Sequence, residues 1–328
     1  QAYGTTLINF AEKISSFSSP LAVGMSGNFR QMKRRILNIA VFRKETLYQK
    51  MRALIIYLVI SAVFIGCTPI LSIDASTQSV YHFSDTDKNI SLLDISETFG
   101  TYDGSFVLYD NNLDSWKIYN LEEATKRIPP ESTYKIYDAL LGLESGIITP
   151  EHSSMTWNGD AFPFPSWEAD QDLNSAMQNS VNWYFQAIDS QLGINRVQGF
   201  LNKIEYGNQT TSSNLDLYWS DFSLKISPLE QVTLLKKFNT NEFHLNSQNV
   251  FSVKNAIKIA STPNGNFYGK TGTGRVNGQD INGWFIGYVE TSDNSYYFAT
   301  NIQSDSNATG KKAFEITSDI LKKLHIWN

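Results

Sequence analysis

A stretch without charged residues, residues 53–73, constrains this chain more than any other feature. An α-helix rises about 1.5 Å per residue, so a helix over this stretch is long enough to cross a hydrocarbon layer about 30 Å thick. The sequence therefore predicts a transmembrane helix at 53–73. A secretory signal peptide is the alternative, but its apolar region usually has about 7–15 residues and follows a short basic flank. Here residues 1–52 precede the stretch.

Charge is distributed unevenly on the two sides of this stretch. Residues 1–52 contain nine Lys or Arg against two Glu, a charge of +7, so the remainder must carry −12 to reach the total of −5. Basic segments lie on the cytoplasmic side of a membrane helix, which places residues 1–52 in the cytoplasm and the part after residue 73 outside the cell. The run Lys33-Arg34-Arg35 is expected to be a solvated or lipid-facing surface and not a nucleic-acid site, because no aromatic residues alternate with it.

The part after the apolar stretch reads as a polar tether and a globular domain. Residues 74–95 are rich in Ser, Asp and Thr, which is typical of a tether, and residues 96–328 form the expected domain. Alternating apolar residues and turn signals predict strands at 104–109, 115–119, 267–271, 283–289 and 296–302, and apolar spacing predicts a helix at 311–324. Residues 130–260 read as mostly helical. The sequence therefore predicts an α+β fold, in which helices flank an antiparallel sheet and form an insertion.

A serine and a lysine lie one helical turn apart at the start of the helical region. Two prolines precede Ser132, and apolar residues recur at helical spacing until Gly146, so Ser132 is expected in the first turn of a helix. Residues three apart on a helix are neighbours, which places Lys135 beside Ser132. Lys135 can serve as the base for the Ser132 hydroxyl only if it is uncharged, through burial or through conversion to a carbamate by carbon dioxide. Alone, the pair is more typical of a helix cap with an exposed lysine.

Ser180 and Asn182 form a second motif, Ser-x-Asn. Their hydroxyl and amide groups are able to pass a proton between Ser132 and a leaving nitrogen. The alternative is that Ser180 only caps a helix, because apolar residues at helical spacing follow it.

Lys270, Thr271 and Gly272 form a third motif, Lys-Thr-Gly, on a predicted strand. The lysine charge and the threonine hydroxyl suit a carboxylate, and the backbone N–H of Thr273 is expected to complete an oxyanion hole with that of Ser132. In this order the three motifs supply the nucleophile, base and ligand-binding strand of a penicillin-reactive serine site.

The chain resembles the class D β-lactamases from about residue 104 to residue 327. The motifs that carry the resemblance are Pro130-Glu131-Ser132-Thr133-Tyr134-Lys135, Tyr206-Gly207-Asn208, the segment 224–231, Tyr268-Gly269-Lys270-Thr271-Gly272-Thr273-Gly274 and the segment 283–288. Together with a membrane helix and a basic cytoplasmic segment, they make the chain more similar still to the BlaR and MecR receptors of Gram-positive bacteria. Gln1 is not a translation start, so we expect a fragment of a longer membrane protein.

The resemblance implies a different role for each part of the chain. Residues 1–52 would be the tail of an integral-membrane zinc metallopeptidase, 53–73 its last membrane helix, and 96–328 an external penicillin-binding sensor domain. Ser132 would be acylated by a β-lactam, with Lys135 as the carboxylated base. Occupancy would signal inward to proteolysis that relieves a cytoplasmic repressor. Trp219 would pack over the Lys135 site, unless it is an ordinary core tryptophan.

Asn182 departs from the hydrolytic enzymes, which carry an apolar valine at this position. Our hypothesis is that Asn182 hydrogen-bonds Lys135 and favours its uncarboxylated form after acylation, so that the adduct persists. Three functional classes remain open: a receptor with little turnover, a membrane-anchored class D β-lactamase, and a cell-wall transpeptidase.

Cofactors are not expected in this chain beyond the carbon dioxide of a carbamate on Lys135. The lone Cys67 excludes a zinc–cysteine site, no His-Glu-x-x-His motif occurs, and zinc belongs to the upstream peptidase in the resembling family. The four histidines lie in polar segments, which argues against a Ser-His-Asp triad.

Overall fold

The computed structural model describes residues 79–84 and 88–328. The predicted cytoplasmic segment 1–52 and membrane helix 53–73 lie outside the described residues. Within the described part of the chain, no helix combines the length and the apolar character that crossing a membrane requires.

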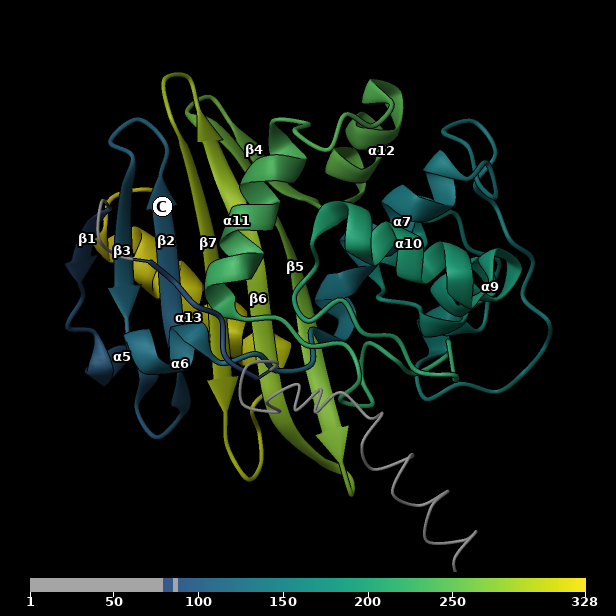
Figure 1. Ribbon diagram of the computed structural model, residues 1–328, viewed down its shortest axis with the longest axis horizontal. Helices are drawn as coiled ribbons and strands as arrows, with labels where there is room; N and C mark the ends of the chain where they lie inside the picture. Colours follow the sequence, from purple (N-terminus) through teal and green to yellow (C-terminus); the bar gives the residue numbers. More distant parts are fainter. Residues whose placement is uncertain (1–78, 85–87) are drawn as a thin grey trace, which may run out of the picture. The chain divides into compact units, whose positions relative to one another are not determined.

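A seven-stranded sheet forms the centre of the described domain (Figure 1). Its spatial order is β1-β3-β2-β7-β6-β5-β4, and all neighbours are antiparallel except β1 and β3. The strands are β1 (Asn89–Leu92), β2 (Asp103–Asp110), β3 (Ser115–Tyr119), β4 (Lys258–Thr262), β5 (Gly265–Val276), β6 (Gln279–Thr291) and β7 (Ser295–Gln303). The five predicted strands and the α+β class are confirmed, whereas the edge strands β1 and β4 were not predicted. Strand β1 lies within the segment 74–95 that was expected to be a tether.

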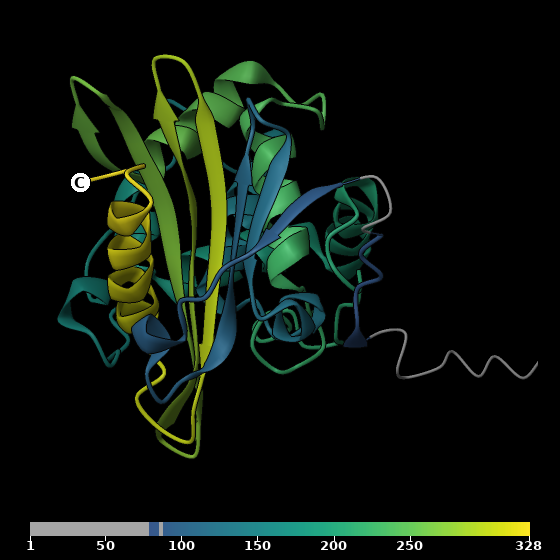
Figure 2. The ribbon, with the colours of Figure 1, turned by 90° about the vertical axis from the view of Figure 1, so that its left-hand side faces the viewer.

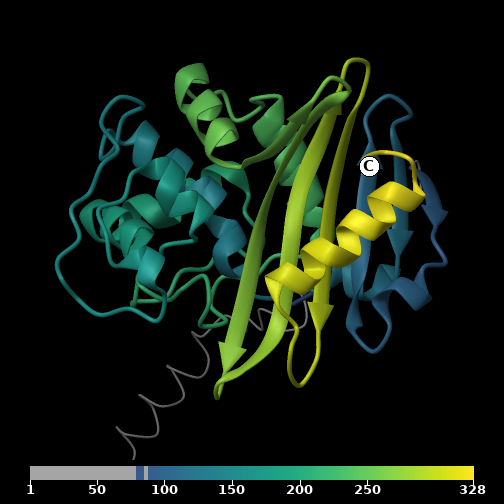
Figure 3. The same ribbon diagram turned by 180° about the vertical axis from the view of Figure 1, so that it is seen from behind.

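Helices cover both faces of the sheet. Helix α13 crosses one face, where it packs on β5, β6 and β7, and α11 packs on the opposite face (Figures 2 and 3). Helices α7 to α10 and α12 gather beside β5 as the predicted helical insertion (Figure 1). The helices are α5 (Ser96–Phe99), α6 (Leu121–Thr125), η1 (Glu131–Tyr134), α7 (Lys135–Glu144), η2 (Pro165–Trp167), α8 (Leu173–Gln178), α9 (Asn182–Leu192), α10 (Ile194–Ile204), α11 (Pro228–Asn239), α12 (Ser247–Ala256) and α13 (Gly310–Lys323).

The sheet separates two apolar cores because side chains alternate between its faces. On β2, Phe106 and Leu108 join the core under α13, whereas Val107 and Tyr109 join the larger core shared with α11 and the helical insertion. This period of two is what the hydrophobic pattern of the strands predicted. Burial on both faces makes the sheet a rigid support for the motif on β5.

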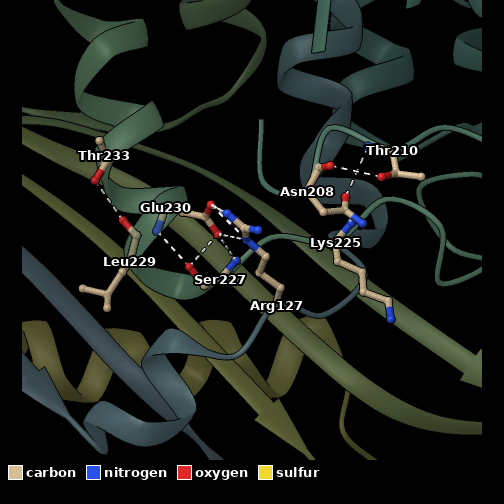
Figure 4. A network of polar contacts seen from close by, with 8 residues as sticks. All are labelled: Arg127, Asn208, Thr210, Lys225, Ser227, Leu229, Glu230 and Thr233. Atoms are coloured by element: carbon tan, nitrogen blue, oxygen red, sulfur yellow. Dashed lines mark hydrogen bonds and ion pairs between the residues drawn. The ribbon is translucent and has the colours of Figure 1, made fainter. Parts of the chain in front are cut away.

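The chain that leads into η1 is held against the start of α11. Ile128 and Ile226 exchange backbone hydrogen bonds of 3.1 and 2.9 Å. Arg127 donates to the Glu230 carboxylate at 2.9 Å through Nε, and Glu230 also accepts from the Ser227 backbone at 3.0 Å in a capping box (Figure 4). These contacts fix the position from which Ser132 is presented.

A second contact joins two of the sequence motifs. Asn208 accepts a hydrogen bond from the Lys225 backbone N–H at 2.9 Å (Figure 4). It also donates to the Ser223 carbonyl at 2.7 Å. Gly207 has φ of 51°, and a Cβ there would meet the Lys225 carbonyl oxygen at 1.9 Å. Only glycine allows this approach, which explains the Tyr-Gly-Asn motif in structural terms.

Candidate active site

Ser132 lies in the short helix η1, which continues into α7 as the sequence predicted. The Thr133 backbone N–H and hydroxyl both donate to the Pro130 carbonyl, at 3.2 and 2.6 Å, and Gln231 donates to the Thr133 hydroxyl at 2.9 Å. These bonds tighten the turn that carries the serine. Ser132 is half-buried and lines a cavity of about 330 Å³.

Lys135 is fully buried beside Ser132. Its Nζ lies 2.7 Å from Ser132 Oγ, and it donates to Asn182 Oδ1 at 2.6 Å and to the Ser180 carbonyl at 3.1 Å. Burial, and then the charge of Lys270, hold the pKa of Lys135 well below its ordinary value. Within the described part of the chain no carboxylate forms an ion pair with Lys135. The geometry therefore provides an uncharged amine in contact with the serine hydroxyl.

Ser180 stands between two buried lysines. It precedes α9 with a left-handed φ of 55°, and Lys270 donates to its hydroxyl at 2.9 Å. Lys135 Nζ lies 3.5 Å from the same hydroxyl. Burial lowers the pKa of Lys270 to about 7. Ser132, Lys135, Ser180 and Lys270 therefore form one continuous hydrogen-bonded row, as a proton relay requires.

Strand β5 lies close against the turn that carries the nucleophile. A Cβ on Gly272 would meet the Ser132 backbone nitrogen at 3.2 Å, so the glycine permits this approach. Thr271, Gly272 and Thr273 line the cavity, and the Thr273 hydroxyl accepts a hydrogen bond from the Gly310 N–H at 2.8 Å. The structure thus brings the Lys-Thr-Gly motif to Ser132, while the oxyanion role of the Thr273 N–H stays a prediction.

Glu131, directly before the nucleophile, was not predicted as part of the site. It is 6% exposed, has a left-handed φ of 53°, and accepts a hydrogen bond from Asn282 at 3.4 Å. Burial raises the pKa of its carboxyl to about 8. Nothing in the sequence marks it, because a glutamate before a serine is usually solvated.

The rim of the cavity also contains residues that the motifs did not reveal. Phe164, Ser166 and Trp167 line the cavity, and so do Arg275 and Asp280. Arg275 Nε donates to Asp280 Oδ1 at 2.7 Å, and the Trp167 indole donates to the Asn179 carbonyl at 3.0 Å. Three aromatic residues around two prolines at 162–167 were the available sequence signal for this rim.

Trp219 is buried and does not line the cavity. Its ring stacks on Tyr134 with centroids 6.2 Å apart, and its carbonyl accepts a hydrogen bond from the Glu131 N–H at 3.1 Å. It supports the turn of the nucleophile from behind. The histidines are exposed: His82, His152, His244 and His325.

The surroundings of Lys135 match a free amine better than a carbamate. The two N–H bonds of an uncharged amine suit the Ser180 carbonyl and Asn182 Oδ1, which leaves the lone pair of Nζ free to accept from the Ser132 hydroxyl. A carbamate accepts hydrogen bonds and would need donors in place of the Ser180 carbonyl and Asn182 Oδ1. We therefore assign no chemical step to a carbamate.

Comparison with known proteins places this geometry in context. Residues 98–322 match the family described as the penicillin binding protein transpeptidase domain. The chain is 42% identical to the regulatory protein BlaR1 of Bacillus licheniformis over 99% of the chain and 54% of that relative. It is 37% identical to the probable β-lactamase YbxI of Bacillus subtilis over 72% of the chain and 86% of that relative.

A solved structure extends the similarity to three dimensions. The C-terminal domain of the Bacillus licheniformis BlaR penicillin-receptor has a TM-score of 0.72 and 46% sequence identity, and the match covers 74% of this chain and 99% of that one. The match with BlaR1 covers 99% of this chain, but the chain spans only about half the length of that relative.

Proposed function

The chain belongs to the penicillin-binding protein transpeptidase family, within its BlaR/MecR group, and from this premise we propose that it is the β-lactam-sensing part of a receptor. The observation that carries the proposal is the placement of buried Lys135 between Ser132 at 2.7 Å and Asn182 at 2.6 Å. The contact with Ser132 supplies a base for acylation of the serine by a β-lactam. The contact with Asn182 slows hydrolysis of the acyl adduct.

Acylation follows from the row of hydrogen bonds. Ser132 Oγ attacks the carbonyl carbon of the lactam, and its proton moves to the uncharged Nζ of Lys135. The ring C–N bond breaks, and the leaving nitrogen takes a proton that Lys135 delivers through the Ser180 hydroxyl. An O–H and a C–N bond are thereby exchanged for an ester bond and an N–H bond. Lys270 and Thr271 would hold the carboxylate of the antibiotic.

Persistence of the ester follows from the acceptors around Lys135. Hydrolysis needs a base that takes a proton from water. In the acyl-enzyme, Ser132 Oγ is an ester oxygen, and Lys135 is a free amine again because it has passed its proton to the leaving nitrogen. The Ser180 carbonyl and Asn182 Oδ1 still accept from Nζ, so they favour the uptake of a further proton that gives the ammonium form. An ammonium is no base, so the adduct should outlast the encounter that formed it, as a sensor requires.

The alternative function is that of a membrane-anchored class D β-lactamase. The identity to YbxI favours a shared acylation chemistry, but the identity to the BlaR sensor domain is higher. Asn182 favours the receptor, because an apolar residue there would leave Nζ with one acceptor fewer and ease its return to the free amine.

Placement at the membrane and the downstream signal are part of the proposal. BlaR1 and MecR1, which the chain resembles over 99% of its length, are named regulatory and methicillin-resistance proteins. By this likeness, the uncharged stretch 53–73 would anchor the domain outside the cell, and acylation would activate proteolysis of a cytoplasmic repressor by the longer protein.

Time-resolved kinetics with a chromogenic cephalosporin test the receptor against the hydrolase. A receptor gives one burst equal to the amount of protein and then little turnover, whereas a β-lactamase continues at a steady rate. Acylation that is slow with β-lactams, together with activity on peptidoglycan stem peptides, would instead identify a transpeptidase.

A further inference from the structure

Two aspartates are enclosed behind the active site without hydrogen-bond partners. Asp138 on α7 and Asp189 on α9 are both 0% exposed. The Tyr218 hydroxyl faces Asp189, but in the described part of the chain neither this hydroxyl nor any of the four carboxyl oxygens has a hydrogen-bond partner of normal geometry. A buried carboxylate left in this state is costly, so the pair needs an explanation.

Protonation of both carboxyls, with one of them donating to the other, removes the difficulty. Ionised carboxylates only accept hydrogen bonds, whereas a protonated carboxyl can donate to its neighbour. Burial, and then the charge of Asp189, raise the pKa of Asp138 well above its ordinary value. Burial also raises the pKa of Asp189 above its ordinary value. The two groups therefore titrate as one proton-sharing pair.

The pair lies one helical turn from the base of the active site. Lys135 and Asp138 are three residues apart on α7 and so lie on the same side of the helix. A negative charge on Asp138 favours the ammonium form of Lys135, and it acts on Lys135 more strongly than Glu131 does. The other titratable groups that face the pair or Lys135 are Tyr134, Tyr184, Asp216, Tyr218, Glu131 and Lys270.

We propose that Asp138 and Asp189 form a proton-storing pair that holds Lys135 as an ammonium in the acyl-enzyme and so prolongs the covalent adduct. One proton leaves the pair and one arrives on Nζ, so the total charge of the closed site does not change. The second proton stays between the carboxyls. Both aspartates are positioning residues, since they act through Lys135. The inference rests on the proposed function, because it needs an acyl adduct whose lifetime can be measured.

The effect of the aspartate pair on the lifetime of the adduct should depend on pH, unlike the effect of Asn182. At low pH the solvent keeps Lys135 protonated whether or not the pair is present. At high pH the free amine would form, unless the anionic pair stabilises the ammonium. Removing the pair should therefore shorten the lifetime of the adduct mainly at alkaline pH.

The test is the lifetime of the benzylpenicillin adduct on the purified chain, followed by intact mass from pH 5.5 to pH 9. In Asp189→Asn and in Asp138→Asn, which keep the shape of the side chain, we expect deacylation at least tenfold faster than in the parent at pH 9. At pH 5.5 the rates should agree within twofold. Thermal unfolding measured alongside reports whether each variant folds.

Tyr137→Phe is the matched control, because it removes a buried hydroxyl without a hydrogen-bond partner from the residue next to Asp138 and changes no charge. It should leave the lifetime unchanged at every pH. Glu131→Gln should change the lifetime less than Asp189→Asn does.

An adduct that forms normally, but whose deacylation rates in parent and variant keep the same ratio at every pH, would overturn the inference while leaving the receptor proposal intact. Absence of any adduct on the parent chain would instead overturn the proposed function. If one aspartate variant fails to fold, the other decides.

Discussion

Replacing Asn182 by valine removes one of the two acceptors that Lys135 keeps after acylation. Asn182 Oδ1 lies 2.6 Å from Nζ, against 3.1 Å for the Ser180 carbonyl, so it is the closer of the two. A hydrogen bond to a charged group contributes about 1.5–3 kcal/mol. Since 1.36 kcal/mol corresponds to tenfold in a proton equilibrium, the free-amine fraction of Lys135 should rise roughly 10- to 100-fold.

The larger free-amine fraction of Lys135 should raise the rate of turnover. With a chromogenic cephalosporin, we expect Asn182→Val to keep the initial burst and to show a steady rate after it that is roughly 10- to 100-fold above that of the parent, because the same base then serves deacylation. Asn182→Asp is the matched control: it has the same size, but its negative charge favours the ammonium. Its steady rate should not rise.

An intact burst followed by an unchanged steady rate in Asn182→Val would refute the reasoning, since it would show that the protonation of Lys135 does not limit deacylation. A rise in both variants would point to a simple loosening of the site.

Three further predictions concern the base, the support of the site and its pH dependence. Lys135→Met should lower the acylation rate by about 10²- to 10⁴-fold in stopped-flow measurements without unfolding the protein, because it removes a general base and replaces a buried amine by an apolar side chain. Arg127→Met should lower stability in denaturant titrations by about 3–5 kcal/mol, because it leaves Glu230, which is 7% exposed, without its ion pair. Lys126→Met, which breaks the more exposed ion pairs of Lys126 with Glu122 and Glu123, should cost at most about 1 kcal/mol, and equal losses would contradict this account. The folded protein keeps a proton on Glu131 up to a pKa of about 8, whereas the unfolded chain releases it near 4.5. The free energy of unfolding should therefore fall as the pH rises from about 4.5 to about 8. Glu131→Gln should make this fall less steep, and an identical slope would argue against a protonated Glu131.

The sequence predicted the parts of this molecule that local spacing determines. Ser132 and Lys135 are one turn apart in any helix, and the alternation on β2 dictates which side chains face each core. Strands β1 and β4 escaped prediction because both lie at sheet edges, where exposed residues break the alternation.

Features built from distant parts of the chain could not be predicted in this way. Asp138 and Asp189 are 51 positions apart, and only the packing of α7 on α9 buries their carboxyls together. Glu131 reads as a surface residue until β5 closes over it. The contact between Asn182 and Lys135 was an exception, because the Ser-x-Asn motif indicated it before the structure placed the two atoms 2.6 Å apart.

Intact mass spectrometry of the purified chain after brief exposure to benzylpenicillin tests the central claim most directly. The account predicts one covalent adduct per chain, located on the Ser132 peptide, stable over hours, and absent from Ser132→Ala. No gain in mass, or an equal gain in the alanine variant, would contradict it.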